Sequence, residues 1–187
     1  MSDAPRSARS FERIERSDLD RLAEITLATL REASKRRSDI PNYDQKNIIG
    51  ICLCQGAADH YLAHPSLKSC GIHDFDVWAF FKPQEEGVRF GNRRAATADF
   101  GPSKFKRSPR DPAKFIGRRV DVFWRAIPEH VTLLPDNSIQ QYLEAERTAT
   151  ARELAKKSVI MIWPDDFLGV IWNPKHLGGV ASYDPWE

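Results

Sequence analysis

Short apolar runs separated by turns are the feature of this sequence that most restricts what the chain can fold into. Five runs are rich in Ile, Val, Phe and Trp: Ile48–Cys54, His73–Phe81, Arg119–Ala126, Ser158–Trp163 and Phe167–Trp172. Their lengths, and the Gly, Pro and Asp residues near their ends, predict β-strands. A membrane span needs roughly 18 consecutive apolar residues, and none of these runs approaches that length. We therefore expect a sheet protein without a membrane partner.

Helices are predicted before and between these strands. Apolar residues recur at near-helical spacing over Asp18–Lys35, and Ser138–Ser158 carries a second helical pattern. A short helix over Ala57–His64 is stopped by Pro65. Residues 87–117 contain several Gly and Pro residues, so we expect them to be irregular. The fold class that follows is α/β (α+β), with a small mixed sheet flanked by helices.

The composition is that of a single globular domain. The chain has 187 residues, of which 41% are apolar and 29% are charged, as in ordinary globular proteins. Residues 1–16 are polar and rich in Ser and Arg, so we expect a disordered lead-in without a secretory signal, followed by one domain over residues 17–187. Cys52 and Cys54 alternate within an apolar run, which indicates reduced thiols and a cytoplasmic protein.

Two carboxylates lie one residue apart in the predicted strand His73–Phe81. Side chains alternate between the two faces of a strand, so Asp74 and Asp76 are expected on the same face, about 7 Å apart. Phe75 and Val77 then point into the core. Carboxylates at this separation repel each other unless a cation lies between them, and their hard oxygen ligands suit Mg²⁺. The pair is therefore a candidate metal site.

A third carboxylate, Asp121, is placed inside the predicted strand Arg119–Ala126. Asp is depleted from strands, and here it is flanked by two valines, so its position needs a physical reason. Its setting matches that of Asp74 and Asp76, which also belong to a predicted strand. The alternative is an edge strand on which Asp121 faces solvent and pairs with an arginine.

A glycine marks the turn between the strand Ile48–Cys54 and the helix that follows. The turn has the sequence Gln55-Gly56-Ala57-Ala58. Glycine at such a turn lets a phosphate approach the backbone N–H groups at a helix N-terminus. Many strand-to-helix turns contain glycine for geometry alone, so the signal comes from its position before the carboxylates in the chain.

The order of these elements resembles the polymerase-beta-type nucleotidyltransferase superfamily. In that family an apolar residue and Gly, followed by Gly or Ser, precede an Asp-apolar-Asp/Glu-apolar strand, and a single acid follows on a later strand. Here Gly56-Ala57 precedes Asp74-Phe75-Asp76-Val77, and Asp121 supplies the later acid. The turn is also similar to the Gly-Gly-x-Ala start of abortive-infection-type toxin nucleotidyltransferases. The resemblance covers residues 48–124.

The resemblance implies a nucleotidyltransferase-like core and a magnesium-dependent reaction. Asp74 and Asp76 would hold two Mg²⁺ ions, and Asp121 would share one of them and activate the attacking hydroxyl. Gly56 and Ala57 would bind the triphosphate. A nucleoside monophosphate would pass from an NTP, such as ATP, to a hydroxyl acceptor on RNA, on a protein or on a small molecule, with release of pyrophosphate.

Positive charge is concentrated between the strands that carry the carboxylates. Residues 89–119 contain ten Lys and Arg residues against two Asp, whereas the whole chain has a net charge of only +2. Arg93, Arg94 and Lys104 in this segment are candidate ligands for a triphosphate or for a nucleic-acid backbone. The phenylalanines of the segment would either stack on bases or anchor the loop. A solvated loop that balances nearby acids is the alternative interpretation.

Two other functions are compatible with the same residues. Ala57 stands where the family pattern has Gly or Ser, which favours a catalytically inactive binding or regulatory module of the toxin–antitoxin type. Acids on adjacent strands also serve phosphodiester hydrolysis, which suggests a metal-dependent nuclease. No Glu/Asp-x-Lys motif follows Asp76 on a strand, so the nuclease is the third choice.

Overall fold

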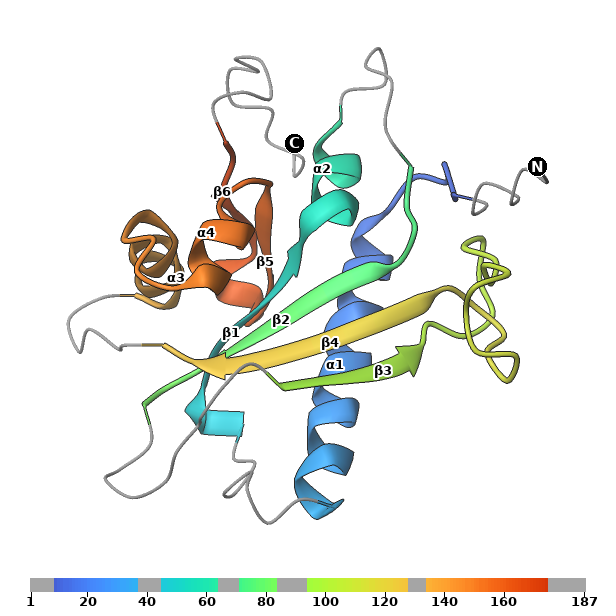
Figure 1. Cartoon of the computed structure of the whole chain (residues 1–187), viewed down its shortest axis with the longest axis horizontal. Coiled ribbons are helices and arrows are strands. Elements are labelled where there is room, and N and C mark those ends of the chain that lie inside the picture. Colours follow the sequence, from blue (N-terminus) through green and yellow to red (C-terminus); the bar gives the residue numbers. More distant parts are fainter. Residues whose placement is uncertain (1–8, 37–44, 64–70, 84–93, 128–133, 175–187) are drawn as a thin grey trace, which may run out of the picture.

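One six-stranded sheet forms the centre of the molecule (Figure 1). The structure is a computed structural model, and it describes residues 9–36, 45–63, 71–83, 94–127 and 134–174. The strands are β1 (Ile48–Cys54), β2 (Phe75–Phe81), β3 (Arg94–Asp99), β4 (Arg119–Ala126), β5 (Val159–Trp163) and β6 (Gly169–Trp172). The α-helices of these residues are α1 (Arg16–Arg36), α2 (Gln55–Leu62), α3 (Pro135–Glu144) and α4 (Ala149–Leu154). The predicted small mixed sheet flanked by helices is thus confirmed.

The sheet is mixed because one pair of neighbouring strands is parallel. The strands lie in the order β3-β4-β2-β1-β5-β6. β2 and β4 run parallel, whereas every other neighbouring pair is antiparallel. Because β3 forms the edge beyond β4, the two parallel strands lie side by side in the interior of the sheet. Among the described helices, none combines the length and the apolarity needed to cross a membrane.

Two hydrophobic clusters hold the helices against opposite faces of the sheet. On one face, Leu22 of α1 packs with Val77 of β2. On the other face, Leu143 of α3 and Leu154 of α4 pack with Met161 of β5. In Figure 1, α1 crosses behind β2, β3 and β4, whereas α3 and α4 gather beside β5 and β6. The starts of β2 and β4 on the second face lie outside the second cluster, whereas further along β2 the Phe80 ring packs against Tyr142 of α3.

The stretch expected to be irregular, residues 87–117, contains a strand that the sequence did not signal. This strand, β3, pairs antiparallel with β4 and begins with Arg94 beside Trp124. Its middle is Ala95-Ala96-Thr97-Ala98, and alanine is depleted from strands. Pairing with β4, which is a tertiary contact, makes this segment a strand.

The single helix predicted over Ser138–Ser158 is wrong, because the structure has two short helices there. α3 ends at Glu144, and Glu146 has a φ of 46°, in the left-handed region that interrupts a helix. Thr148 then caps α4, since its side chain accepts a hydrogen bond from the Ala151 N–H. The other predicted helices and strands lie close to their predicted bounds.

The N-terminal segment joins the domain earlier than the sequence suggests. Residues 1–8 lie outside the described residues. Ser10 exchanges two backbone hydrogen bonds with Ile72, and Ile14 is buried in the core. The disordered lead-in expected over residues 1–16 therefore does not extend over residues 9–16.

Candidate active site

Two of the three predicted carboxylates, Asp76 and Asp121, lie near the starts of two neighbouring strands of the sheet. Asp76 is the second residue of β2, and Asp121 is the third residue of β4. The parallel register places Asp76 directly beside Asp121, so both side chains project from the same face. Side chains of β4 alternate along this stretch between buried and half-buried, and Asp121 belongs to the half-buried set.

Asp74 joins this pair although it lies just outside β2. The strand begins at Phe75 and not at His73 as predicted, so alternation within a strand does not place Asp74. Its carboxylate instead accepts a hydrogen bond from the Arg119 guanidinium. The same guanidinium contacts Asp121, with 3.1 Å between Arg119 Nε and Asp121 Oδ2. Arg119 thus bridges two of the three predicted carboxylates.

The carboxylates of this group outnumber the guanidinium that bridges them. Burial raises the pKa of Asp121, and the charge of Asp74 adds to the shift, against the opposing effect of Arg119. Although burial opposes its charge, Asp74 and Asp121 raise the pKa of Arg119. Thr97 Oγ1 donates a further hydrogen bond to Asp121 Oδ1, at 3.2 Å. The charge of Arg118 also interacts with Asp74, so two guanidinium groups lie near these carboxylates, and a cation would compete with them for the same oxygens.

The donor set fits Mg²⁺ in its chemistry, but Arg119 bridges it in the structure. Carboxylate oxygens are the ligands that Mg²⁺ takes from proteins. Arg119 lies between Asp74 and Asp121, and within the described ranges no three His, Cys, Asp or Glu residues are grouped so that they surround a metal position. A metal that uses all three carboxylates therefore has to replace the contacts of Arg119.

The strand-to-helix turn lies beside the carboxylates. Cys54, the last residue of β1, pairs with Asp76, and α2 begins at the next residue, Gln55, which has a φ of 62°. Gly56 lies in the first turn of α2, where no side chain among the described residues caps the helix. A Cβ atom on Gly56 would lie 3.9 Å from Lys157 Nζ. Helix N–H groups and a lysine therefore meet at this turn, and both suit an anion.

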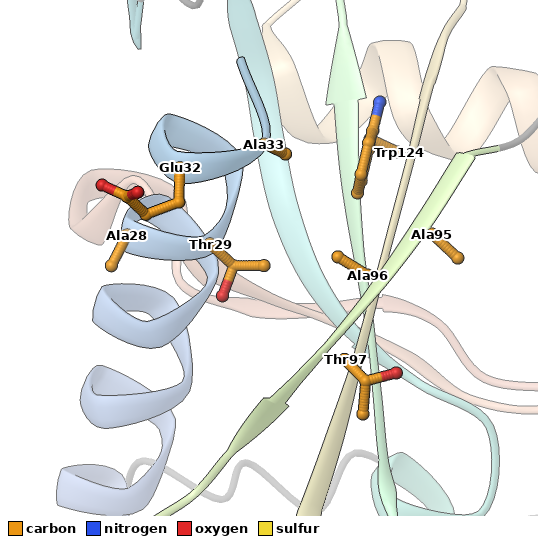
Figure 2. A pocket seen from close by; sticks show the side chains of 8 residues that line it. All are labelled: Ala28, Thr29, Glu32, Ala33, Ala95, Ala96, Thr97 and Trp124. Carbon is orange, nitrogen blue, oxygen red and sulfur yellow. The ribbon is translucent and has the colours of Figure 1, made fainter. Parts of the chain in front are cut away.

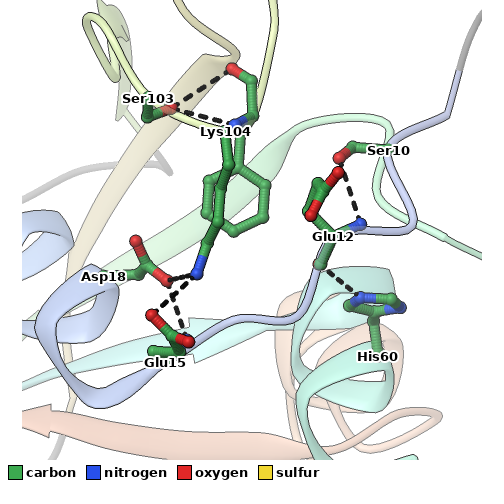
Figure 3. A network of polar contacts seen from close by, with 8 residues as sticks. Ser10, Glu12, Glu15, Asp18, His60, Ser103 and Lys104 are labelled. Atoms are coloured by element: carbon green, nitrogen blue, oxygen red, sulfur yellow. Dashed lines mark hydrogen bonds and ion pairs between the residues drawn. The ribbon is translucent and has the colours of Figure 1, made fainter.

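Two of the predicted ligands direct their side chains elsewhere. Ala57 is buried in the core beneath α2, so only its backbone faces the turn. Lys104 Nζ lies 3.0 Å from Glu15 Oε2 and 3.0 Å from Asp18 Oδ2, where α1 begins (Figure 3). These ion pairs tie the segment after β3 to α1. Lys104 is thus engaged away from the carboxylates.

Phe100 and Phe105 anchor the basic segment, whereas Phe90 lies outside the described residues. Phe100 and Phe105 are fully buried, and their ring centroids lie 5.1 Å and 5.2 Å from that of Phe75. Rings buried in this way have no face left for a base, so anchoring is the correct alternative for these two residues. Arg93 lies outside the described residues, and Arg94 is the first residue of β3.

The cysteines beside the site are inert. Cys52 and Cys54 are free and buried, as predicted. Burial raises the pKa of both thiols, and the charge of Asp76 adds to the shift at Cys54. Neither thiol is therefore a nucleophile or a metal ligand at neutral pH.

A cavity of about 330 Å³ opens directly beside Asp76. It lies between β2, β4, α2 and α4, and its lining residues are Gln55, Asp76, Trp78, Phe123, Ala149, Thr150, Glu153 and Leu154. A second cavity, of about 430 Å³, lies between α1 and β3 over Trp124 (Figure 2). Because Trp124 belongs to the cluster under α1, the second cavity is on the opposite face of the sheet from the carboxylates.

Among the residues of the site, Arg119, Phe123 and Gln55 were not predicted as ligands from the sequence. Arg119 and Phe123 lie two residues before and two residues after Asp121, so alternation along β4 puts them on the same face. That alternation is a signal that the sequence contains. Gln55 had no such signal, because its place at the cavity depends on how α2 and α4 meet in three dimensions.

In comparisons with protein-family models, curated proteins and solved structures, nothing matches this chain. Its function is therefore inferred from the carboxylates, from the adjoining helix N-terminus and from the cavity.

Proposed function

We propose that this protein is a magnesium-dependent nucleotidyltransferase with a polymerase-beta-type core. The observation that carries the proposal is the parallel register of β2 and β4, which sets Asp76 beside Asp121 on one face of the sheet. Arg119 holds Asp74 at the same point. The donor substrate is an NTP such as ATP, and the acceptor is a hydroxyl on RNA, on a protein or on a smaller molecule.

Asp74, Asp76 and Asp121 are the residues that would hold Mg²⁺. The metal supplies charge neutralisation of the triphosphate and of the leaving pyrophosphate. For all three carboxylates to bind it, Arg119 has to release Asp74 and Asp121. A guanidinium freed in this way is suited to a bidentate contact with a phosphate.

The first turn of α2 is the proposed triphosphate site. Backbone N–H groups at Gly56 and Ala57 lie at the positive end of the helix dipole, which stabilises anions. Lys157 adds a positive charge beside Gly56. Because β1 leads into α2 next to Asp76, a phosphate bound at this turn lies next to the carboxylates.

Asp121 is the proposed general base. The parallel register places it beside Asp76, and a carboxylate within hydrogen-bond reach of the acceptor hydroxyl is able to accept its proton. In the transfer step, the acceptor oxygen forms a bond to the α-phosphorus of the NTP. The bond from that phosphorus to the α,β-bridging oxygen breaks, and pyrophosphate leaves. The proton of the acceptor hydroxyl passes to a carboxylate oxygen of Asp121.

The proposal is tested with Asp76→Asn, which keeps the size of the side chain and removes its charge. We expect this variant to weaken Mg²⁺-dependent NTP binding by at least about 10- to 100-fold, the loss typical of substituting a group that only supports a metal ligand, and to abolish pyrophosphate release. Titration calorimetry with each of the four NTPs, with and without Mg²⁺ at constant ionic strength, measures the binding. The matched control is Asp166→Asn, because Asp166 is exposed and remote from the site.

Two results would contradict the proposal. One is NTP binding of equal affinity with and without Mg²⁺. The other is an Asp76→Asn variant that binds the Mg²⁺–NTP complex as tightly as the wild type and the Asp166→Asn control. Loss of the folded state in Asp76→Asn, measured by circular dichroism, would show that Asp76 acts in folding.

A specific observation also supports a second candidate, the inactive binding module. Arg119 forms ion pairs with both Asp74 and Asp121, and a guanidinium in this position competes with a metal ion for the same carboxylate oxygens. Such a module would bind its partner without pyrophosphate release and without a dependence on Mg²⁺. In that case Arg119→Gln would destabilise the fold, since it would leave two carboxylates without their cation.

A further inference from the structure

An aromatic pair continues the face that carries the carboxylates. Trp78 follows Asp76 by two residues in β2, and Phe123 follows Asp121 by two residues in β4, so alternation puts all four on one face. The register sets Trp78 beside Phe123. Their rings are stacked, with centroids 4.9 Å apart and an interplanar angle of 24°. The aromatic pair therefore lies one repeat along the strands from the carboxylates, at about 7 Å.

This pair forms one wall of the cavity beside Asp76. Trp78 is only 4% exposed, whereas Phe123 is half-buried, so Phe123 is the ring that remains accessible from the cavity. The first turn of α4 contributes Thr150, and α2 contributes Gln55. The volume of about 330 Å³ lies within the range of about 300 to 1,000 Å³ that is usual for small-molecule sites.

Polar groups lie around this aromatic wall. Gln55 Nε2 donates a hydrogen bond to the backbone carbonyl of Glu153 at 3.3 Å, which orients the side-chain amide. Gln55 also has the positive φ that non-glycine residues rarely adopt, and such strain concentrates at functional sites. The Thr150 hydroxyl is able both to donate and to accept. An aromatic face with polar groups beside it is the combination that recognises a planar heterocycle.

We infer that this cavity binds the nucleobase of the NTP, with the base stacked on Phe123 and its polar edge directed to Gln55 and Thr150. The inference rests on the proposed function, because a nucleotide held at Asp76 and Gly56 is what brings a base to this cavity. Stacking accepts any base, and the polar groups then favour some bases over others. The competing explanation is that Phe123 only extends the hydrophobic cluster under α3 and α4.

Inorganic tripolyphosphate separates the base site from the phosphate site. The experiment compares the wild type with Phe123→Leu by titration calorimetry in the presence of Mg²⁺, using ATP, GTP, CTP, UTP and tripolyphosphate as probes. We expect Phe123→Leu to weaken the tightest-binding NTP by about tenfold, in line with the effect of losing one stacking contact. Binding of tripolyphosphate should not change. Phe123→Tyr keeps the ring and should retain the affinity for the NTP.

Two further variants separate binding from folding. Phe167 packs against the same hydrophobic cluster as Phe123 but does not line the cavity, so Phe167→Leu should leave the affinity for every probe unchanged. Thr150→Val changes a cavity-lining residue that belongs to α4 and not to the sheet. It should weaken NTP binding and spare tripolyphosphate, even where Phe123→Leu fails to fold.

The outcomes distinguish this inference from the proposed function. Equal weakening of NTP and tripolyphosphate in Phe123→Leu, or no weakening of either, overturns the base site and leaves the nucleotidyltransferase proposal in place. Failure of the wild type to bind tripolyphosphate and every NTP overturns both. Selective loss of NTP affinity in Phe123→Leu and Thr150→Val, with Phe167→Leu unchanged, supports the base site.

Discussion

Asp121 lies on β4 between the Thr97 hydroxyl and the Arg119 guanidinium, with 19% of its side chain exposed. Burial raises its pKa above the ordinary value of Asp. The folded chain therefore holds a proton on this carboxylate more tightly than the unfolded chain does. By linkage, the free energy of unfolding falls as pH rises from the pKa of Asp121 in the unfolded chain to its higher pKa in the folded chain. A carboxylate whose ionisation lowers the stability of the fold is typical of a functional site.

We expect Asp121→Asn to be more stable than the wild type at neutral pH. The difference should grow as pH rises from about 4, the ordinary pKa of Asp, because only the wild type acquires the unfavourable charge. Urea denaturation of both proteins across this pH range measures the difference, and the exposed Asp166→Asn serves as the control. A difference that stays constant with pH, or that shrinks as pH rises, would contradict the raised pKa of Asp121.

At the scale of elements, α4 links the stability of the fold to the candidate site. Its N-cap Thr148 accepts a hydrogen bond from the Ala151 N–H at 3.0 Å. The same hydroxyl lies 2.7 Å from the Tyr142 hydroxyl of α3, so one side chain fixes the start of α4 and its position against α3. The first turn of α4 also lines the cavity, through Ala149 and Thr150.

Thr148→Ala should lower the free energy of unfolding by about 1 kcal/mol, because it removes a helix cap. Thr148→Ser keeps the hydroxyl and should retain most of the stability. Urea denaturation of the two variants measures the effect, and NTP binding to the folded proteins reports on the cavity. An alanine variant as stable as the serine variant would show that the hydroxyl of Thr148 does not hold α4 in place.

At the scale of the whole molecule, the two faces of the sheet are covered unequally. α1 packs along one face of the sheet. On the other face, α3 and α4 cover β1, β5 and the later parts of β2 and β4, where Tyr142 of α3 contacts Phe80 and Arg125. Asp76 and Asp121 lie near the starts of β2 and β4, outside the part that α3 and α4 cover, and the cavity lined by α2 and α4 opens beside Asp76. A ligand that binds these side chains binds only the folded chain, so its binding should raise the free energy of unfolding.

The Mg²⁺ complex of the tightest-binding NTP should stabilise the whole domain. At a free concentration of about 100 times Kd, we expect the free energy of unfolding to rise by about 2.7 kcal/mol. Urea denaturation with and without the complex measures this change, with Asp166→Asn as a control that should respond like the wild type. Equal stabilisation of Asp76→Asn would mean that the ligand binds elsewhere on the chain.

The sequence alone determined most of the secondary structure and the identity of the candidate acids. Two strands, Ile48–Cys54 and Arg119–Ala126, have their predicted bounds, because β-branched and aromatic runs between turn residues carry a strong local signal. Alternation along β4 also fixed the face of Asp121. Local signals were absent for β3, whose alanines become a strand only by pairing with β4, and for the break at Glu146.

The tertiary structure decided which residues meet. The parallel pairing of β2 and β4 brings Asp76 beside Asp121, which lies 45 positions later in the sequence. An ion pair with Arg119 holds Asp74, which lies just before β2, close to Asp121. The tertiary structure also places Lys104 away from the carboxylates, because Lys104 forms ion pairs with Glu15 and Asp18 that no local sequence pattern indicates. The physical reason is that alternation and propensity act between neighbours in the chain. Register, burial and charge pairing act between segments that are brought together only when the core forms.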